Sequence, residues 1–233
     1  MEELKDIKKT ILRTLVGSHA HGLATEKSDR DYRGVFVIPT TELLKLGGIT
    51  KQTSWIEGDT DSTEWEVGHF LNMAVHCNPT VLETFLAPSV FLHPVDSEDA
   101  KLEKELRDLF PHVWNSNDVR NAFVGYGVNQ RKKFFDNKDQ RAPKYAAAYL
   151  RVLYNCAQLL ETGTFDVDLR GSTIYDQVKN FKEGRYTYGE VIQACFDMET
   201  RVIKAYNANP DKKTNVEPVN EFLLKARKHY WDW

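Results

Sequence analysis

The spacing of apolar residues changes near residues 94–116, and this change constrains the fold of the 233-residue chain more than any other feature. Before it, short runs rich in β-branched and aromatic residues are bounded by Gly and Pro, as in "DYRGVFVIP" at 31–39, and such runs are typical of strands. After it, apolar residues recur at helical spacing, as in "KYAAAYLRVLYNCAQLLETG" at 144–163. We therefore predict an α+β protein with a small mixed β-sheet and flanking helices in residues 1–95, followed by a helical domain in residues 96–233.

The first part of the chain predicts several strands joined by short helices. One strand ends at Gly17 and a short helix follows it, and a second, buried strand occupies residues 31–39. A threonine N-cap is expected to begin a short helix at "TTELLKL", residues 40–46. The alternating stretches "KQTSWIE" and "DSTEWEV" are expected to pair as strands around Gly58 and Asp59. Helices are predicted at "GHFLNMAVHC" and "TVLETFLAP".

Charge is distributed unevenly along the chain. Residues 1–116 hold 12 Lys and Arg against 19 Asp and Glu, so their net charge is 12 − 19 = −7. Residues 117–233 hold 19 against 15, so theirs is 19 − 15 = +4. Such a division suits a protein that gathers metal ions with one half and contacts a polyanion with the other, and it is equally expected of solvated charges distributed by chance.

Composition also bears on the compartment and on metal chemistry. Three widely separated cysteines argue against a disulfide framework and for a reducing compartment, so we predict a cytoplasmic protein without a membrane partner. Apolar runs are too short to span a bilayer, and the amphipathic start does not resemble a secretory signal. A zinc site is not predicted, because His69, His76 and Cys77 are spaced for a helix. His19 and His21 are expected at a helix start or on the surface.

A Gly-Ser pair and two aspartates frame the segment between the first two predicted strands. Backbone N–H groups at the helix start after Gly17, together with the Ser18 hydroxyl, suit an anion. Asp29 and Asp31 are two residues apart at the start of the second strand, so we expect both carboxylates on one face of it. Two carboxylates on one face suit a hard cation such as Mg²⁺, whose charge would offset their repulsion.

These stretches make the chain similar to a known superfamily. The Gly17-Ser18 pair, the run "SDRD" at 28–31 and Gly34 ahead of an apolar strand resemble the signature of the DNA polymerase β-like nucleotidyltransferases. A more specific resemblance is to predicted nucleotidyltransferases labelled as RNA repair pathway members, whose pattern continues into an aromatic-rich helix and an Asn-Pro with Leu-Glu soon after, here "HFLNMAVHCNPTVLETFLAP". The resemblance is specific over residues 15–38 and 61–88 and looser over residues 144–163.

The resemblance implies a nucleotidyltransferase-type sheet that binds a nucleoside triphosphate and two Mg²⁺ ions. Ser18, with the backbone at Gly17, would hold the β and γ phosphates. Asp29 and Asp31 would coordinate the metal ions. A third carboxylate, on a neighbouring strand, would ligate the metal that activates the attacking hydroxyl.

We select Asp61 as this third metal-binding and catalytic carboxylate. Glu64 and Glu66 remain alternatives, because the strand register is uncertain by one or two residues. Asp61 and Glu64 do not share a face in a regular strand, so at most one of these two fits.

Basic residues of the helical half are candidates for contact with phosphates. Lys144 and Arg151 are seven residues apart, two helical turns, on a helix whose other residues are mostly apolar, and we predict that they bind nucleotide. Snorkelling to solvent is the alternative explanation. Arg131, Lys132 and Lys133 lie beside two phenylalanines and are predicted to contact a nucleic-acid backbone, unless they merely form a solvated helix face.

The leading functional prediction is a Mg²⁺-dependent nucleotidyltransferase. It would move a nucleoside monophosphate from an NTP to a hydroxyl acceptor, such as an RNA 3′ end, and release pyrophosphate. A protein hydroxyl, as in adenylylating relatives, or a small molecule is an alternative acceptor. A catalytically decayed nucleotide-binding module and a plain interaction protein are the alternatives from other functional classes.

Overall fold

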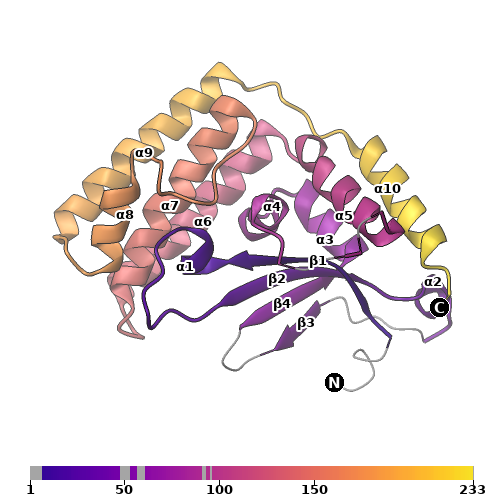
Figure 1. Ribbon diagram of the computed structural model, residues 1–233. Helices are drawn as coiled ribbons and strands as arrows, with labels where there is room; N and C mark the ends of the chain where they lie inside the picture. The colour runs from indigo at the N-terminus through magenta and orange to yellow at the C-terminus, as the bar shows by residue number, and fades with distance from the viewer. Residues whose placement is uncertain (1–6, 48–52, 57–60, 91–92, 95, 233) are drawn as a thin grey trace. The chain divides into compact units, whose positions relative to one another are not determined.

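The computed structural model describes residues 7–47, 53–56, 61–90, 93–94 and 96–232 (Figure 1). The chain forms two compact units. Unit 1 comprises Met1–Val75, Thr80–Val113 and Thr214–Trp233, and unit 2 comprises His76–Pro79 and Trp114–Lys213. The predicted α+β class is confirmed, because unit 1 contains a four-stranded sheet with helices and unit 2 is helical.

The sheet of unit 1 has the strand order β1-β2-β4-β3. Its pairs β1–β2 and β3–β4 are antiparallel, whereas β2 and β4 are parallel, which requires a crossover between them. The predicted β3–β4 pairing is confirmed, while the turn expected around Gly58 and Asp59 lies outside the described residues. The bounds of the strands are β1 Lys9–Val16, β2 Asp31–Val37, β3 Thr53–Ile56 and β4 Ser62–Glu66.

One face of the sheet carries the apolar core of unit 1. Leu12 and Val35 are register partners on β1 and β2, and both are fully buried. Trp65 of β4 lies on the same face, 6.2 Å from the ring of Phe70, and Phe70 is 4.8 Å from Phe85. These aromatic contacts hold helices α3 (Val67–Val75) and α4 (Pro79–Leu86) against the sheet, and both helices lie where the sequence predicted them.

The predicted threonine cap of the helix after β2 is wrong. Helix α2 (Thr40–Leu44) begins with Thr40, and Pro39 occupies the N-cap position, where no side chain caps the helix. The Thr40 hydroxyl instead donates a hydrogen bond of 2.8 Å to the backbone oxygen of Arg227. A contact with a residue so distant in sequence outweighs the local preference of threonine for capping, and no sequence pattern signals it.

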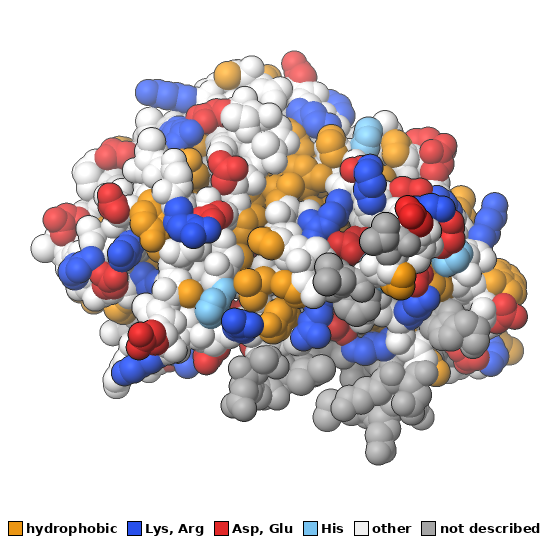
Figure 2. All heavy atoms as spheres, viewed as in Figure 1, with side chains coloured by type: hydrophobic (Ala, Val, Ile, Leu, Met, Phe, Trp, Pro, Cys, Tyr) orange, Lys and Arg blue, Asp and Glu red, His pale blue; other side chains and the backbone are white. Residues whose placement is uncertain are grey.

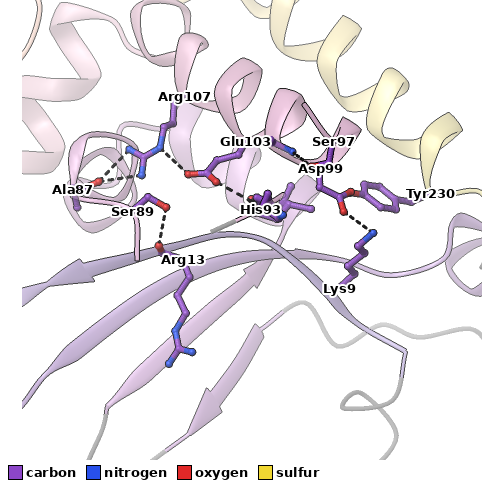
Figure 3. A network of polar contacts seen from close by, with 12 residues as sticks. Lys9, Arg13, Ala87, Ser89, His93, Ser97, Asp99, Glu103, Arg107 and Tyr230 are labelled. Carbon is purple, nitrogen blue, oxygen red and sulfur yellow. Dashed lines mark hydrogen bonds and ion pairs between the residues drawn. The ribbon is translucent and has the colours of Figure 1, made fainter. Parts of the chain in front are cut away.

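Helices α5 (Glu98–Asp108) and α10 (Val216–His229) belong to unit 1. Figure 3 shows the polar network that holds them: Lys9 of β1 pairs with Asp99 of α5 at 2.8 Å, and the Tyr230 hydroxyl, just after α10, donates to the same carboxylate. Arg107 of α5 donates to the Ala87 backbone oxygen at 3.1 Å. These compact units therefore divide the chain differently from the boundary expected after residue 95, because α5 and α10 pack with the sheet.

Unit 2 is built around helix α7 (Ala142–Thr162), most of which is buried. Pro143 stands in its first turn, and Gly163 ends it in the left-handed conformation with φ +83°. Gly127 of α6 lets that helix approach closely, because a Cβ atom there would lie 3.3 Å from Leu153. The other helices are α6 Ser116–Asp136, α8 Tyr175–Lys182 and α9 Tyr188–Ala208. In the described part of the chain, no helix has the length and apolarity needed to cross a membrane.

Candidate active site

The Gly-Ser pair of the sequence lies where β1 turns into the single-turn helix α1 (Gly17–Ala20). Gly17 has φ +66°, a conformation that disfavours any residue with a Cβ atom. A Cβ atom at Gly17 would also lie 2.2 Å from Oδ2 of Asp31, which is far inside van der Waals contact. Glycine is therefore required here both for the turn and for the close approach of the Asp31 carboxylate to the backbone.

Asp31 and Asp61 enter the sheet side by side. Asp31 is the first residue of β2, and Asp61 directly precedes β4. The parallel register begins with Tyr32 opposite Ser62, so the two aspartates are one position before the first pair, and the Tyr32 N–H donates to the Asp61 carbonyl at 2.8 Å. Since register neighbours share a face, Asp31 and Asp61 belong to the same face of the sheet.

Asp29 is placed differently from the prediction. Strand β2 begins only at Asp31, so Asp29 lies in the exposed segment before it and not on the strand. The alternation of strand side chains therefore does not fix the direction of its carboxylate. The structure thus places Asp31 next to Gly17 through strand register and packing. Asp29 is near this position because it is two residues before Asp31 in the sequence.

The two alternative carboxylates of β4 lie on the opposite face of the sheet. Glu64 is the register partner of Gly34, and a Cβ atom at Gly34 would lie 3.0 Å from the Glu64 side chain. Glu64 is buried and forms an ion pair with Lys8. Glu66, on the same face, is also buried and pairs with Arg227 at 2.7 Å. Strand geometry therefore favours Asp61 over both glutamates as the companion of Asp31.

The donor chemistry at this end of the sheet suits Mg²⁺. Asp31 and Asp61 offer oxygen ligands from neighbouring strands, and Mg²⁺ commonly takes one or two carboxylates while keeping several waters. Within the ranges that the structure describes, no three His, Cys, Asp or Glu side chains are grouped so as to hold a metal ion. Asp31 and Asp61 thus fit an ion bound by a carboxylate pair, and the metal-binding roles of Asp29, Asp31 and Asp61 stay predictions.

The two histidines near the Gly-Ser pair have protein partners. His19 places Nε2 3.0 Å from the backbone oxygen of Ser28. His21 is buried, and its Nε2 lies 3.0 Å from Oε1 of Glu83 on α4. His19 therefore lies within α1, whereas His21 is the C-cap of this helix and is buried, so the expected surface or helix-start position is wrong for His21.

The comparison with family models decides where this chain belongs. The model described as the RNA repair pathway DNA polymerase beta family, RlaP, matches residues 1–224. The chain belongs to this family. The resemblance predicted from the sequence is thereby confirmed, and the match to the RlaP family includes residues of both units.

Two individual proteins are similar to this RlaP family member. An uncharacterized 38.9 kDa protein from the nrdC-mobD intergenic region of Enterobacteria phage T4 is 24% identical over 135 residues, which cover 54% of this chain and 39% of the phage protein. The matching region thus spans well under half the length of that relative. The crystal structure of a nucleotidyltransferase-like protein from Exiguobacterium sibiricum 255-15 aligns with 95% of this chain and 74% of its own, at 10% identity and a TM-score of 0.27.

The pair of His21 and Glu83 joins the two stretches that carry the RlaP family resemblance. His21 belongs to "GSHAHGL", and Glu83 belongs to "NPTVLETF". Sequence reasoning gave Glu83 no role, although it was the glutamate of the recognised Leu-Glu pattern. This contact links helix α4, which begins at Pro79, to the turn that follows Gly17. An expected contact between the two motif stretches is the sequence signal that would have identified the pair.

The predicted phosphate-binding cations of the RlaP family member all lie in unit 2. Lys144 is exposed and Arg151 is half-buried on α7. Arg131, Lys132 and Lys133 are exposed near the end of α6. Figure 2 shows basic and acidic side chains intermingled over the helices of this unit, so its surface is mixed in charge there. The proposed contacts of these cations remain predictions.

Proposed function

We propose that this RlaP family member is a Mg²⁺-dependent nucleotidyltransferase that moves a nucleoside monophosphate from an NTP to a hydroxyl acceptor, with an RNA 3′ end as the first candidate. The single observation that supports this proposal best is the packing of the Asp31 carboxylate against Gly17, with Asp61 at the start of the neighbouring strand. This arrangement places acidic oxygens beside a backbone turn that only glycine permits.

The roles proposed for the residues follow from their chemistry. Asp31 and Asp61 would hold Mg²⁺, with Asp29 as a further ligand, and when bound this ion would supply neutralisation of the triphosphate charge. The Ser18 hydroxyl and the backbone N–H groups that follow Gly17 would donate to the β and γ phosphates. Because α1 is a single turn, we assign these contacts to individual donors and little to a helix dipole.

The proposed reaction is an in-line displacement at the α phosphorus. The acceptor oxygen forms a bond to this phosphorus, the bond between the phosphorus and the bridging α–β oxygen breaks, and pyrophosphate leaves. The proton of the hydroxyl passes to water. The protein would contribute positioning and electrostatic stabilisation, which supply most of the catalysis in phosphoryl transfer.

A second candidate function is nucleotide binding without turnover. It is favoured by one observation, namely that the described residues group no three acidic or metal-binding side chains for a metal ion. In this case Ser18 and Asp31 would bind an NTP with Mg²⁺, and no acceptor would be modified. Turnover therefore separates the two candidates.

Incubation with each α-labelled NTP, Mg²⁺ and a mixed pool of RNA and protein tests the proposal. We expect the wild type to transfer label to RNA and Asp31→Asn to transfer none. Label on protein would keep the transferase and replace its acceptor. Saturable NTP binding without transfer to any acceptor would favour the second candidate, and neither binding nor transfer would refute both.

A further inference from the structure

Aromatic side chains gather in unit 2 where α6 ends and α9 begins. Phe134 is fully buried, and its ring lies 4.8 Å from Tyr188 and 5.8 Å from Tyr186. Next to this buried ring, Phe135 and Tyr188 are 53% and 52% exposed. Their rings are nearly parallel, at 24° with centroids 6.2 Å apart. We call Phe135 and Tyr188 the aromatic platform.

The backbone beneath the aromatic platform is fixed on both sides. Tyr188 is the first residue of α9 and lies inside a capping box. The Thr187 hydroxyl accepts from the Glu190 N–H at 3.2 Å, and the Glu190 carboxylate accepts from the Thr187 N–H at 2.6 Å. Phe135 lies in the last turn of α6, which Asn137 ends in the left-handed conformation. Rings held in this way lose little conformational entropy when a ligand covers them.

The two segments that carry the aromatic platform have a net positive charge. Residues 129–144 carry six Lys and Arg against two Asp, and residues 179–190 carry three against two Glu, so the two segments have a net charge of (6 + 3) − (2 + 2) = +5 in a chain of net charge −3. Arg131 and Lys132 precede Phe135 by four and three residues and therefore share its side of α6. Of the four acidic side chains, Asp139 accepts from Tyr145, Glu183 pairs with Arg185, and Glu190 caps α9.

We propose that the aromatic platform binds single-stranded nucleic acid, with bases stacked on the faces of Phe135 and Tyr188 and phosphates held by Arg131 and Lys132. Flat exposed rings beside cations are the two parts that such sites combine. The faces of duplex bases are covered by their neighbours, so a double strand does not reach the rings. A protein partner is the alternative occupant, and it is less favoured because lysines such as Lys132 are depleted in protein interfaces. This inference rests on the proposed function only in that the bound single strand is taken to be the nucleic-acid acceptor of the transfer.

Fluorescence anisotropy with labelled 12-nucleotide single strands of RNA and DNA, and with a matched duplex, tests the proposal on the full chain. Stacking contributes about 1–3 kcal/mol per base, which corresponds to a factor of about 5 to 150 in Kd. We expect Phe135→Ala to raise the Kd for the single strands about tenfold. Phe196→Ala removes an equally exposed aromatic ring (62% exposed) from the middle of α9 and should change the Kd less than twofold.

Tyr188→Leu separates stacking from general apolar contact, because leucine keeps bulk and lacks a flat face. We expect it to weaken binding as much as Phe135→Ala does. Because Tyr188 packs on Phe134, the thermal stability of Tyr188→Leu is measured together with its binding. If this variant unfolds, the half-exposed Phe135 still provides the test through Phe135→Ala. Equal losses for Phe135→Ala and Phe196→Ala, equal affinity for duplex, or no single-strand binding by the wild type would each overturn the platform. None of these results would contradict the proposed transfer of label to an acceptor. The platform and the nucleotidyltransferase activity can therefore be refuted independently.

Discussion

The two ends of the sheet in unit 1 use acidic residues differently. Toward the end where β1 begins and β4 finishes, carboxylates meet Lys or Arg side chains from distant parts of the chain, in the pairs Lys8–Glu64, Lys9–Asp99 and Arg227–Glu66. At the other end, Asp31 and Asp61 begin neighbouring strands, and Asp31 packs on the backbone of Gly17. We call these the clamped end and the aspartate end.

From this difference we assign two roles to the acidic residues at and around the sheet. At the clamped end, the ion pairs join Lys8 to β4, Lys9 of β1 to α5, and α10 to β4, so removing one partner of a pair is expected to destabilise the fold. At the aspartate end, two acidic side chains are brought together on one face, which raises their mutual repulsion. We infer that the ion pairs of the clamped end stabilise the fold. At the aspartate end, we infer that a bound cation would reduce the electrostatic repulsion between the two carboxylates.

The largest expected effect belongs to the aspartate end. Asp31→Asn should lower nucleotidyl transfer about a hundredfold or more, because charge neutralisation worth several kcal/mol is lost and each ~1.4 kcal/mol corresponds to a factor of ten. Stability should hold or rise slightly, because a repulsive charge is removed. Initial rates with labelled NTP, measured beside a melting curve, check both parts. Near-normal turnover of this variant in Mg²⁺ would contradict a metal role for Asp31.

Asp61→Asn extends the same test to the second carboxylate. We expect turnover to fall more than NTP affinity, because this residue is proposed to serve the attacking hydroxyl. Glu64→Gln on the same strand is the matched control, since it removes a carboxylate from the opposite face. If Glu64→Gln lost turnover per folded molecule and Asp61→Asn did not, the assignment of the catalytic face would be reversed.

The next largest effect is on stability at the clamped end. Glu64→Gln removes the buried carboxylate that pairs with the Lys8 ammonium, whose side chain is 14% exposed, and should lower the free energy of unfolding by about 3 kcal/mol. Urea denaturation measures this change. Lys8→Met combined with Glu64→Gln should recover part of this loss, because the cation that the carboxylate pairs with is then absent as well. If Glu64→Gln were as stable as the wild type, the stabilising role of Glu64 at the clamped end would be contradicted.

Sequence reasoning reached the aspartate end more completely than the clamped end for a physical reason. Gly17 and Asp31 lie in one short stretch, where turn chemistry and strand alternation are local properties. The Lys8–Glu64 and Arg227–Glu66 pairs join residues that only the completed fold brings together, so no spacing rule finds them. The same limit explains why α10 was assigned to a helical domain rather than to the sheet.

Register explains the remaining difference at the site. The sequence left Asp61, Glu64 and Glu66 open, because a shift of one residue exchanges the faces of a strand. The pairing of Tyr32 with Ser62 fixes that register and places Asp61 with Asp31. The sequence-based prediction places Asp29 on the strand together with Asp31, but strand pairing starts only at Asp31, where Val16 is its partner.

A smaller, pH-dependent effect is expected from Asp99 of the clamped end. Burial alone would raise the pKa of Asp99, but hydrogen bonds from Lys9 and Tyr230 outweigh it and hold the pKa below its usual value. A lowered folded-state pKa contributes stability above the unfolded pKa of about 3.9, and this stability is lost as the pH falls through the folded value. Asp99→Asn should therefore lower unfolding free energy by about 1.5 kcal/mol at pH 5–8, with the difference shrinking below about pH 4. A constant difference down to pH 2 would contradict this linkage.

The smallest expected effect is at the turn of the aspartate end, and it tests whether this end meets a triphosphate. Ser18→Ala should weaken NTP binding by about 1 kcal/mol, the net contribution of one hydrogen bond, or somewhat more because the acceptor is charged. Binding of the corresponding nucleoside monophosphate should change little, because it lacks the β and γ phosphates. Thr41→Ala on α2 removes a hydroxyl from another short helix and is the matched control. Calorimetric titrations with both nucleotides decide the matter: equal losses for the tri- and monophosphate would place Ser18 away from the terminal phosphates, and the phosphate-binding role of the turn after Gly17 would have to be withdrawn.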